Sequence, residues 1–253
     1  MRLIDSHCHL DDPLFADDLE VVYQNARNVG VEHIIVPSVS ARYWVRVKHL
    51  TVTLANTHAA YGLHPMFIGT HEPEDITRLE RWVQDEKPVA IGECGLDYYS
   101  HKETREQQLV YFDAQLALAH AIQLPVIVHA RKAVEDAMRA IRRYPGLRGV
   151  FHSFSGSYEQ ASRLMDNGFY LGFGGPVTWA RSHRLHTLVR KLPLSSLLLE
   201  TDAPDQPDEA HRGQRNEPAY LAGIASAIAR LKGISMEELA AATTENATKL
   251  FFT

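Results

Sequence analysis

Short apolar runs recur along the whole chain, and nearly every one is followed by a longer stretch with helical periodicity. The eight runs read RLID, HIIVP, AAYGLHP, PVAIGE, PVIVHA, GVFHSF, FYLGFGG and SLLLETD. Their apolar residues are consecutive rather than alternating, which is typical of strands buried on both faces, as in a parallel sheet. Eight strands that alternate with helices predict a TIM (β/α)8 barrel.

The segments between these runs carry the apolar stripe of amphipathic helices. In ETREQQLVYFDAQLALAHAIQ, residues Leu109, Phe112, Leu116 and Ala119 fall on one helical face. Pro125 then ends the helix and opens the next strand. The tail AAATTENATKLF predicts a capped terminal helix that packs by Leu250 and Phe251.

The length of the chain fits the barrel better than the alternative architecture. A single α/β barrel of 253 residues is ordinary, so we expect residues 1–253 to form one domain. A doubly wound open sheet is the competing fold. It usually has fewer strands and often begins with a glycine-rich first turn, which this sequence lacks.

Composition excludes several classes of protein. With 45% apolar residues the chain can bury a large core, and a net charge of −5 argues against a surface coated for nucleic acid, although not against a local basic cleft. Two cysteines without framework spacing indicate a reducing compartment. No signal pattern or membrane-length apolar run is present, so we expect a cytoplasmic protein with no membrane contact and no obligatory protein partner.

Residues that bind metals follow the predicted strands at the end where barrel enzymes carry their catalytic groups. In LIDSHCHL, residues 3–10, which begin in the first run, strand alternation turns His7 and His9 to one side and Cys8 to the other. Taken singly, such a histidine is more often a hydrogen-bonded structural residue than a ligand. The recurrence of these residue types at successive strand ends is what predicts a metal site. Its candidate ligands are His7, His9, Glu93, His129, His152 and Asp202.

Six candidate ligands exceed the number that one tetrahedral ion uses. A carboxylate flanked by histidines on both sides suits two ions roughly 3.5–4 Å apart, and Glu93 is the natural bridge because its strand lies between the others in chain order. We therefore expect two divalent ions per chain, with zinc, manganese or magnesium as candidates and a transition metal favoured by the many histidines. Such a pair predicts hydrolysis, most naturally of a phosphate ester.

Blocks over nearly the whole chain resemble one family, the TatD-type metal-dependent deoxyribonucleases of the amidohydrolase-like barrel superfamily. The similarity is greatest to the YjjV-like bacterial branch. The blocks are IDSHCHLD, GLHP, AIGECGLDY, QLPVIVHAR, FHSFSGS, LLLETDAP, RGQRNEPAYL and TTENATKLF, in the family's order. A glutamate in AIGEC, where many amidohydrolases carry a modified lysine, favours this branch over those that cleave ureides and lactams.

The resemblance implies a role for each candidate ligand. The first ion would be held by His7, His9, Glu93 and Asp202, and the second by Glu93, His129 and His152. Asp202 also matches the carboxylate that takes the proton of the attacking water. A general base must lie within hydrogen-bond reach of that water, and a carboxylate at the metal site meets this requirement. The implied activity is metal-dependent cleavage of DNA.

The residues that contact the substrate are less well defined by the sequence. His64 in GLHP is a candidate for the substrate cleft, or it has a structural role beside Pro65. Arg131, Arg212 and Arg215 are candidates for substrate phosphates, although an arginine of HRGQRNEP could instead pair with Glu200, Asp205 or Glu217. Asp97 either orients a histidine ligand or holds its own turn.

Three functions remain open at this stage. The first is a phosphodiesterase that acts on DNA, although no aromatic stacking platform is obvious in the sequence. The second is a hydrolase of a small ester, an amide or an aminoacyl ester. The third, a non-catalytic metal protein, fits least, because structural sites rarely need six ligands.

Overall fold

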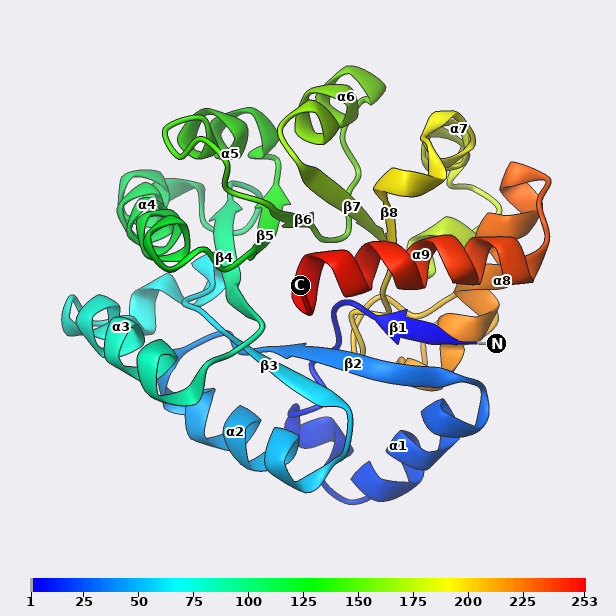
Figure 1. Ribbon diagram of the computed structural model, residues 1–253, viewed down its shortest axis with the longest axis horizontal. Helices are drawn as coiled ribbons and strands as arrows, with labels where there is room; N and C mark the ends of the chain where they lie inside the picture. The colour runs from blue at the N-terminus through cyan, green and yellow to red at the C-terminus, as the bar shows by residue number, and fades with distance from the viewer. Residues whose placement is uncertain (1) are drawn as a thin grey trace. The chain divides into compact units, whose positions relative to one another are not determined.

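The strands follow one another around the sheet in chain order. The computed structural model describes residues 2–253. Its strands are β1 (Leu3–Asp5), β2 (Val31–Pro37), β3 (Thr57–Tyr61), β4 (Ala90–Asp97), β5 (Val126–Arg131), β6 (Gly149–Phe151), β7 (Phe169–Phe173) and β8 (Leu197–Leu199). They form one sheet in the order β1 to β8, and the pairs whose register is described are parallel. The predicted TIM barrel is confirmed (Figure 1).

Helices connect the strands as the sequence predicted. The α-helices are α1 (Leu19–Asn28), α2 (Trp44–Thr53), α3 (Glu74–Glu86), α4 (Arg105–Ile122), α5 (Val134–Ile141), α6 (Tyr158–Asp166), α7 (His183–Lys191), α8 (Leu221–Lys232) and α9 (Met236–Phe251). Short 3₁₀ helices are η1 (Pro13–Phe15), η2 (Ala41–Tyr43), η3 (Pro65–Thr70), η4 (Lys102–Thr104), η5 (Gly175–Thr178), η6 (Leu194–Ser196) and η7 (Pro218–Tyr220). Within residues 2–253, no helix is long and apolar enough to cross a membrane.

The chain divides into two compact units, which we treat separately. The terminal unit contains the chain up to Val36, Ser153–Tyr158 and Tyr170–Thr253. The central unit contains Pro37–His152 and Glu159–Phe169. Each unit carries strands of the barrel and the loops that follow them.

In the central unit, β4 is buried along its whole length and pairs closely with β5. All eight residues of β4 are buried. Gly95 pairs with His129 and has a φ of +143°, and a Cβ there would lie 2.0 Å from the His129 carbonyl oxygen. Glycine at position 95 therefore lets β4 approach β5 closely beside His129. On α4, Phe112, Leu116 and Ala119 are fully buried, as the predicted helical face requires, whereas Leu109 near the start of the helix is only partly buried.

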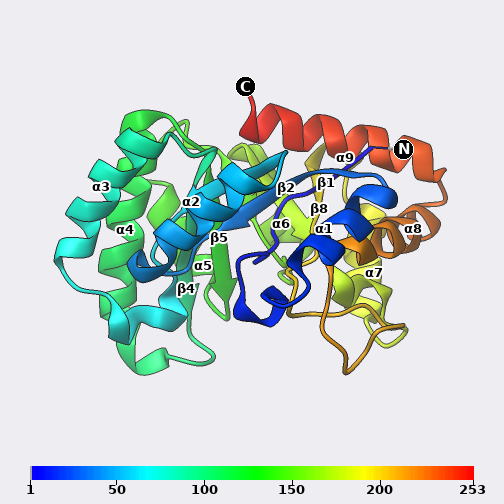
Figure 2. The same cartoon turned by 90° about the horizontal axis from the view of Figure 1, so that it is seen from below.

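In the terminal unit, α9 lies against β1 and β8 (Figures 1 and 2). Ser235 caps the helix by accepting a hydrogen bond from the Glu238 N–H at 3.1 Å. The side-chain amide of Asn246 donates to the carbonyl oxygen of Leu197, the first residue of β8, at 2.9 Å. Leu250 and Phe251 are buried, so the predicted packing of this terminal helix is confirmed.

Candidate metal centre

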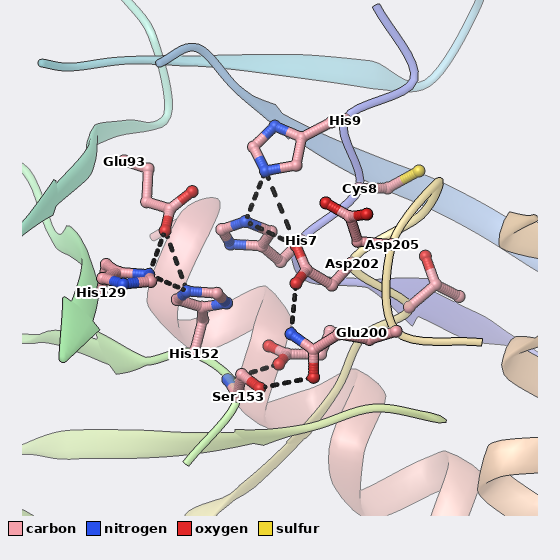
Figure 3. A network of polar contacts seen from close by, with 12 residues as sticks. His7, Cys8, His9, Glu93, His129, His152, Ser153, Glu200, Asp202 and Asp205 are labelled. Carbon is pink, nitrogen blue, oxygen red and sulfur yellow. Dashed lines mark hydrogen bonds and ion pairs between the residues drawn. The ribbon is translucent and has the colours of Figure 1, made fainter. Parts of the chain in front are cut away.

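Three side chains meet in the terminal unit and form what we call the terminal cluster: His7, His9 and Asp202. The Nε2 atoms of His7 and His9 lie 3.2 Å apart, and Asp202 Oδ1 lies 3.4 Å from the first and 3.6 Å from the second (Figure 3). Both imidazoles turn the same way, while Cys8 points away and is fully buried. Strand alternation predicted this arrangement.

Backbone hydrogen bonds beyond β1 and β8 place these side chains together. The N–H of Asp202 donates to the His7 carbonyl oxygen at 2.8 Å, and the N–H of His9 donates to that of Ala203 at 2.8 Å. The assigned strands end at Asp5 and Leu199, before the ligands, whereas the sequence pattern placed His7 and His9 within the first strand. The ligands therefore lie on the loops that directly follow the strands.

Asp5, fully buried at the end of β1, joins the two loops of the terminal cluster. Its carboxylate accepts hydrogen bonds from the Thr201 N–H at 3.0 Å, the Thr201 hydroxyl at 2.6 Å and the His7 N–H at 3.2 Å. Burial raises the pKa of Asp5 to about 7, although these hydrogen bonds act in the opposite direction. Asp5 thus fixes the backbone on either side of the cluster.

A glutamine holds Asp202 from its other side. Gln206 donates from Nε2 to Asp202 Oδ2, and its Oε1 accepts a hydrogen bond from the Ser153 hydroxyl at 2.9 Å. Asp202 has a φ of +58°, in the left-handed region, where aspartate is tolerated better than most residues. Sequence reasoning missed Gln206 because nothing in the pattern marks it.

A second set of donors meets in the central unit, and we call Glu93, His129 and His152 the central cluster. Glu93 Oε1 lies 3.1 Å from His129 Nδ1 and 2.9 Å from His152 Nε2, and the two nitrogens are 3.1 Å apart (Figure 3). Glu93 comes from the middle of β4, His129 from β5 and His152 from the residue after β6. Glu93 is almost fully buried.

Asp97 orients His129 from the side opposite Glu93. Its Oδ2 lies 3.1 Å from His129 Nε2, so the ring donates there and leaves Nδ1 facing Glu93. Its Oδ1 accepts from the N–H groups of Tyr99 and Ser100 at 2.9 and 2.8 Å. Burial alone would raise the pKa of Asp97, but these hydrogen bonds outweigh it and hold that pKa at about 2. Both roles considered for Asp97 are present.

The imidazole of His129 therefore lies between two carboxylates. Burial acts to lower the pKa of His129, but hydrogen bonds to Asp97 and Glu93 raise it more, and the net shift is upward. Such surroundings favour positive charge, which a proton or a metal ion can supply.

His64 lies against Glu93 rather than at the molecular surface. Its Nδ1 accepts from the Met66 N–H at 3.1 Å, so its Nε2 carries the proton, and this nitrogen lies 2.9 Å from Glu93 Oε1. His64 is 5% exposed. The geometry therefore gives His64 the role of a hydrogen-bond donor to Glu93.

The donor sets fit divalent ions. His7, His9 and Asp202 place their ligand atoms within 4.8 Å of one another. In the central cluster the facing atoms of Glu93, His129 and His152 lie 2.9–3.1 Å apart. Neutral imidazole and carboxylate are ligands for zinc and manganese. A tetrahedral ion with bonds of 2.0–2.1 Å spaces its ligands about 3.3–3.4 Å apart, and the separations in the terminal cluster are 3.2–3.6 Å.

The three candidate arginines have different surroundings. Arg215 donates to both carboxylate oxygens of Asp18, at 2.8 and 2.7 Å, and to Glu217 at 2.8 Å. Because Arg215 forms ion pairs within the protein, we do not assign it to the substrate. Arg131 lies over the ring of Tyr99 at 4.0 Å, and Arg212 lies over the ring of Trp179 at 5.4 Å. Both of these arginines are exposed.

Comparison with known proteins identifies the family to which this chain belongs. The family described as TatD related DNase matches residues 4–252. The Escherichia coli metal-dependent hydrolase YjjV is 38% identical over 253 residues, covering 99% of this chain and 98% of YjjV. The Bacillus subtilis metal-dependent hydrolase YabD is 38% identical over 251 residues, covering 98% of both chains.

The solved structures give the same result for the fold. The crystal structure of YjjV, a TatD homologue, superposes with a TM-score of 0.95 over 100% of this chain and 98% of the other. This chain therefore belongs to the TatD-related DNase family of metal-dependent hydrolases.

Proposed function

We propose that the protein hydrolyses phosphodiester bonds of DNA with two divalent ions bound by the terminal and central clusters. The observation that carries the proposal is the pair of donor triangles, each made of imidazole nitrogens and one carboxylate oxygen. The terminal cluster and His152 follow the carboxyl ends of barrel strands, where catalytic residues of this fold gather, while Glu93 and His129 lie within β4 and β5. The proposal therefore assigns a catalytic role to each cluster.

Each ion has its own ligands in this proposal. The first would be held by His7, His9 and Asp202, the second by His129 and His152, and Glu93 would serve both. When bound, the pair supplies the Lewis acidity that makes water nucleophilic near neutral pH and neutralises charge on a phosphate. Manganese, zinc and magnesium all suit this role, and the imidazole ligands favour the first two.

The protein's own residues position the ligands and move the proton. Asp202 Oδ1 faces the imidazoles of His7 and His9, so Oδ2 is the atom that takes the proton from the attacking water. The hydrogen bond from Gln206 keeps this carboxylate in place. His64 donates to Glu93 and Asp97 accepts from His129, so the central cluster is oriented before ions or substrate bind.

Hydrolysis by metal-stripped and reloaded protein tests the proposal. The protein is reloaded with Mn²⁺, Zn²⁺ or Mg²⁺ and assayed on labelled single-stranded DNA beside bis(p-nitrophenyl) phosphate, with Asp202→Asn as the comparison. We expect metal-dependent cleavage of both substrates, lost in the variant. Cleavage of the small ester but not of DNA would keep the chemistry and refute the substrate. Cleavage of neither would refute the proposal and direct the search to amides and aminoacyl esters.

A further inference from the structure

An aromatic ring with two guanidinium groups close to it lies on the loops that follow β7 and β8. Trp179 is half-buried between η5 and α7, and Arg181 and Arg212 lie over its ring with Cζ at 4.7 and 5.4 Å from the centroid. Arg181 is close in sequence, but Arg212 comes from the β8 loop. We call these three residues the tryptophan cluster.

Hydrogen bonds hold the indole in a fixed position. Trp179 donates from Nε1 to the Pro207 carbonyl oxygen at 3.0 Å. The N–H of Glu209 donates to the Thr178 hydroxyl at 2.8 Å, and the N–H of Ala180 donates to Glu209 Oε2 at 3.1 Å. These hydrogen bonds link the β7 loop and the β8 loop in both directions. The indole is therefore already ordered, and little conformational entropy is lost when a ligand binds to it.

The backbones of the β7 loop and the β8 loop also approach each other closely. A Cβ on Gly175 would lie 2.0 Å from the Gln206 carbonyl oxygen, so only glycine allows this contact. Gln206 is also the residue whose side chain donates to Asp202. One short segment, Gln206–Pro207, thus holds the proposed general base on one side and the indole on the other.

The guanidinium groups keep their capacity to bind an anion. Among the ion pairs of residues 2–253, none involves Arg181 or Arg212, in contrast to Arg215, which binds two carboxylates. An arginine held over an aromatic ring retains its in-plane N–H donors, which suit a phosphate bidentately. Loops after the seventh and eighth strands are also where barrels commonly bind phosphate.

We propose that the tryptophan cluster is a nucleotide subsite, in which a base stacks on Trp179 while Arg181 and Arg212 bind the adjacent phosphate. This inference rests on the proposed function and narrows its substrate to single-stranded nucleic acid with accessible bases. Stacking on an indole needs a splayed base and tolerates any base, because every base has a π-face. A small phosphodiester does not reach this subsite.

Binding of matched probes separates stacking from charge. The probes are fluorescein-labelled phosphorothioate oligothymidylate and an abasic phosphorothioate chain of the same length, titrated by anisotropy against the manganese-loaded protein. We expect wild type to bind the base-containing probe about tenfold more tightly, about 1.4 kcal/mol, a size typical of base stacking. Trp179→Ala abolishes this difference and Trp179→Phe keeps most of it. Arg212→Ala weakens both probes by a similar factor.

Matched controls lie elsewhere in the terminal unit. Phe252→Ala removes an exposed aromatic side chain, and Arg190→Ala removes an exposed arginine in the last turn of α7. Both are expected to bind the two probes as wild type does. Equal loss in the controls, or a preference for bases that survives in Trp179→Ala, refutes the subsite.

Turnover distinguishes failure of the subsite from failure of the proposed function. Trp179→Ala should lower kcat/KM on single-stranded DNA about tenfold more than on bis(p-nitrophenyl) phosphate, which does not reach the subsite. If wild type cuts DNA and Trp179→Ala cuts it equally well, the subsite is refuted and the nuclease remains. If the oligonucleotide binds through Trp179 but is not cut, the nuclease is refuted and the subsite remains. If it neither binds nor is cut, both are refuted.

Discussion

Asp202 has a left-handed backbone conformation, and its two carboxylate oxygens have different partners. Oδ1 lies near His7, and Oδ2 accepts a hydrogen bond from Gln206. Asparagine suits this backbone and keeps the shape of the side chain, but it cannot take a proton. We expect Asp202→Asn to fold with an unchanged circular dichroism spectrum, to retain most of its metal and to lose about 10²–10⁴-fold in turnover. Metal analysis and hydrolysis rates on one preparation measure both quantities. A rate near wild type would remove Asp202 from the base role.

Asp97 affects metal binding through His129 without being a proposed ligand. Asp97→Asn keeps an oxygen for the Tyr99 and Ser100 N–H groups but removes the charge next to His129 Nε2. Loss of such a carboxylate behind a histidine ligand typically lowers metal affinity 10–100-fold. Chelator competition measures the affinity. The control is Asp113→Asn, which removes a carboxylate on α4 that pairs with Arg143 and should leave the metal affinity unchanged. A single affinity for all three proteins would mean that Asp97 only holds its turn.

At the residue scale, the predictable part of the site comes from local periodicity. His7 and His9 face the same side because side chains of an extended chain alternate, and this needs no knowledge of the fold. Gln206 contributes to the site by hydrogen bonds with Asp202 and Ser153, and Asp5 contributes by its hydrogen bond with Thr201. Asp5 and Thr201 are 196 positions apart, so a pairing of this kind depends on which loops the fold brings together.

At the element scale, Arg215 fastens the β8 loop to the start of the chain. Besides Asp18 and Glu217 it donates to the Leu14 carbonyl oxygen at 2.7 Å, and it lies over the Phe15 ring. The Asp18 and Glu217 carboxylates raise the pKa of Arg215, which stays charged throughout the working range. Arg215→Ala should lower Tm by roughly 2–6 °C, because several charged hydrogen bonds are lost together.

The control for Arg215 lies in the same loop. Arg212→Ala removes an exposed arginine that makes no ion pair within residues 2–253, and its Tm should stay within about 1 °C of wild type. Both variants should hydrolyse bis(p-nitrophenyl) phosphate at the wild-type rate per folded molecule. If Arg215→Ala kept its Tm and lost turnover instead, Arg215 would belong to the site after all.

Strand positions were predictable from the apolar runs, but strand ends were not. The runs identified all eight strands, including the glycine-rich β7. Yet β6 and β8 are only three residues long, and Ser153 and Asp202, which follow them, have left-handed backbones. A left-handed residue ends regular pairing and turns the chain, and apolar patterning carries no signal for it.

At the scale of the whole molecule, the alternation of strands and helices was sufficient to predict the barrel, because the apolar runs are mostly buried, as strands of a parallel sheet are. The expectation of a single domain and of two ions stays a prediction. Global charge is a weaker guide, since a net charge of −5 coexists with arginines that pack on exposed or half-exposed aromatic rings. Local arrangement, which composition averages away, therefore decides whether a polyanion can bind.

Bound ions should stabilise the folded chain, and this effect should depend on pH. A ligand at a hundred times its Kd stabilises a protein by about 2.7 kcal/mol, so Mn²⁺ or Zn²⁺ should raise the Tm of the stripped protein by roughly 5–10 °C at pH 7.5. Four of the six proposed ligands are histidines, which bind metals only when neutral. Protons therefore compete with the ions as the pH falls, most of all at His129, whose pKa is raised by its hydrogen bonds to Asp97 and Glu93, so the gain is largest at high pH and shrinks on acidification.

Thermal unfolding of stripped and reloaded protein at pH 7.5 and pH 5.5 measures the gain directly. We expect the difference in Tm between the two forms to shrink by more than half at the lower pH. His183→Ala, which removes an exposed histidine at the start of α7, should show the wild-type gain at both values. An equal gain at both pH values would mean that the ions bind through carboxylates alone, because carboxylates remain ionised at pH 5.5. That result would refute the histidine ligands of both clusters.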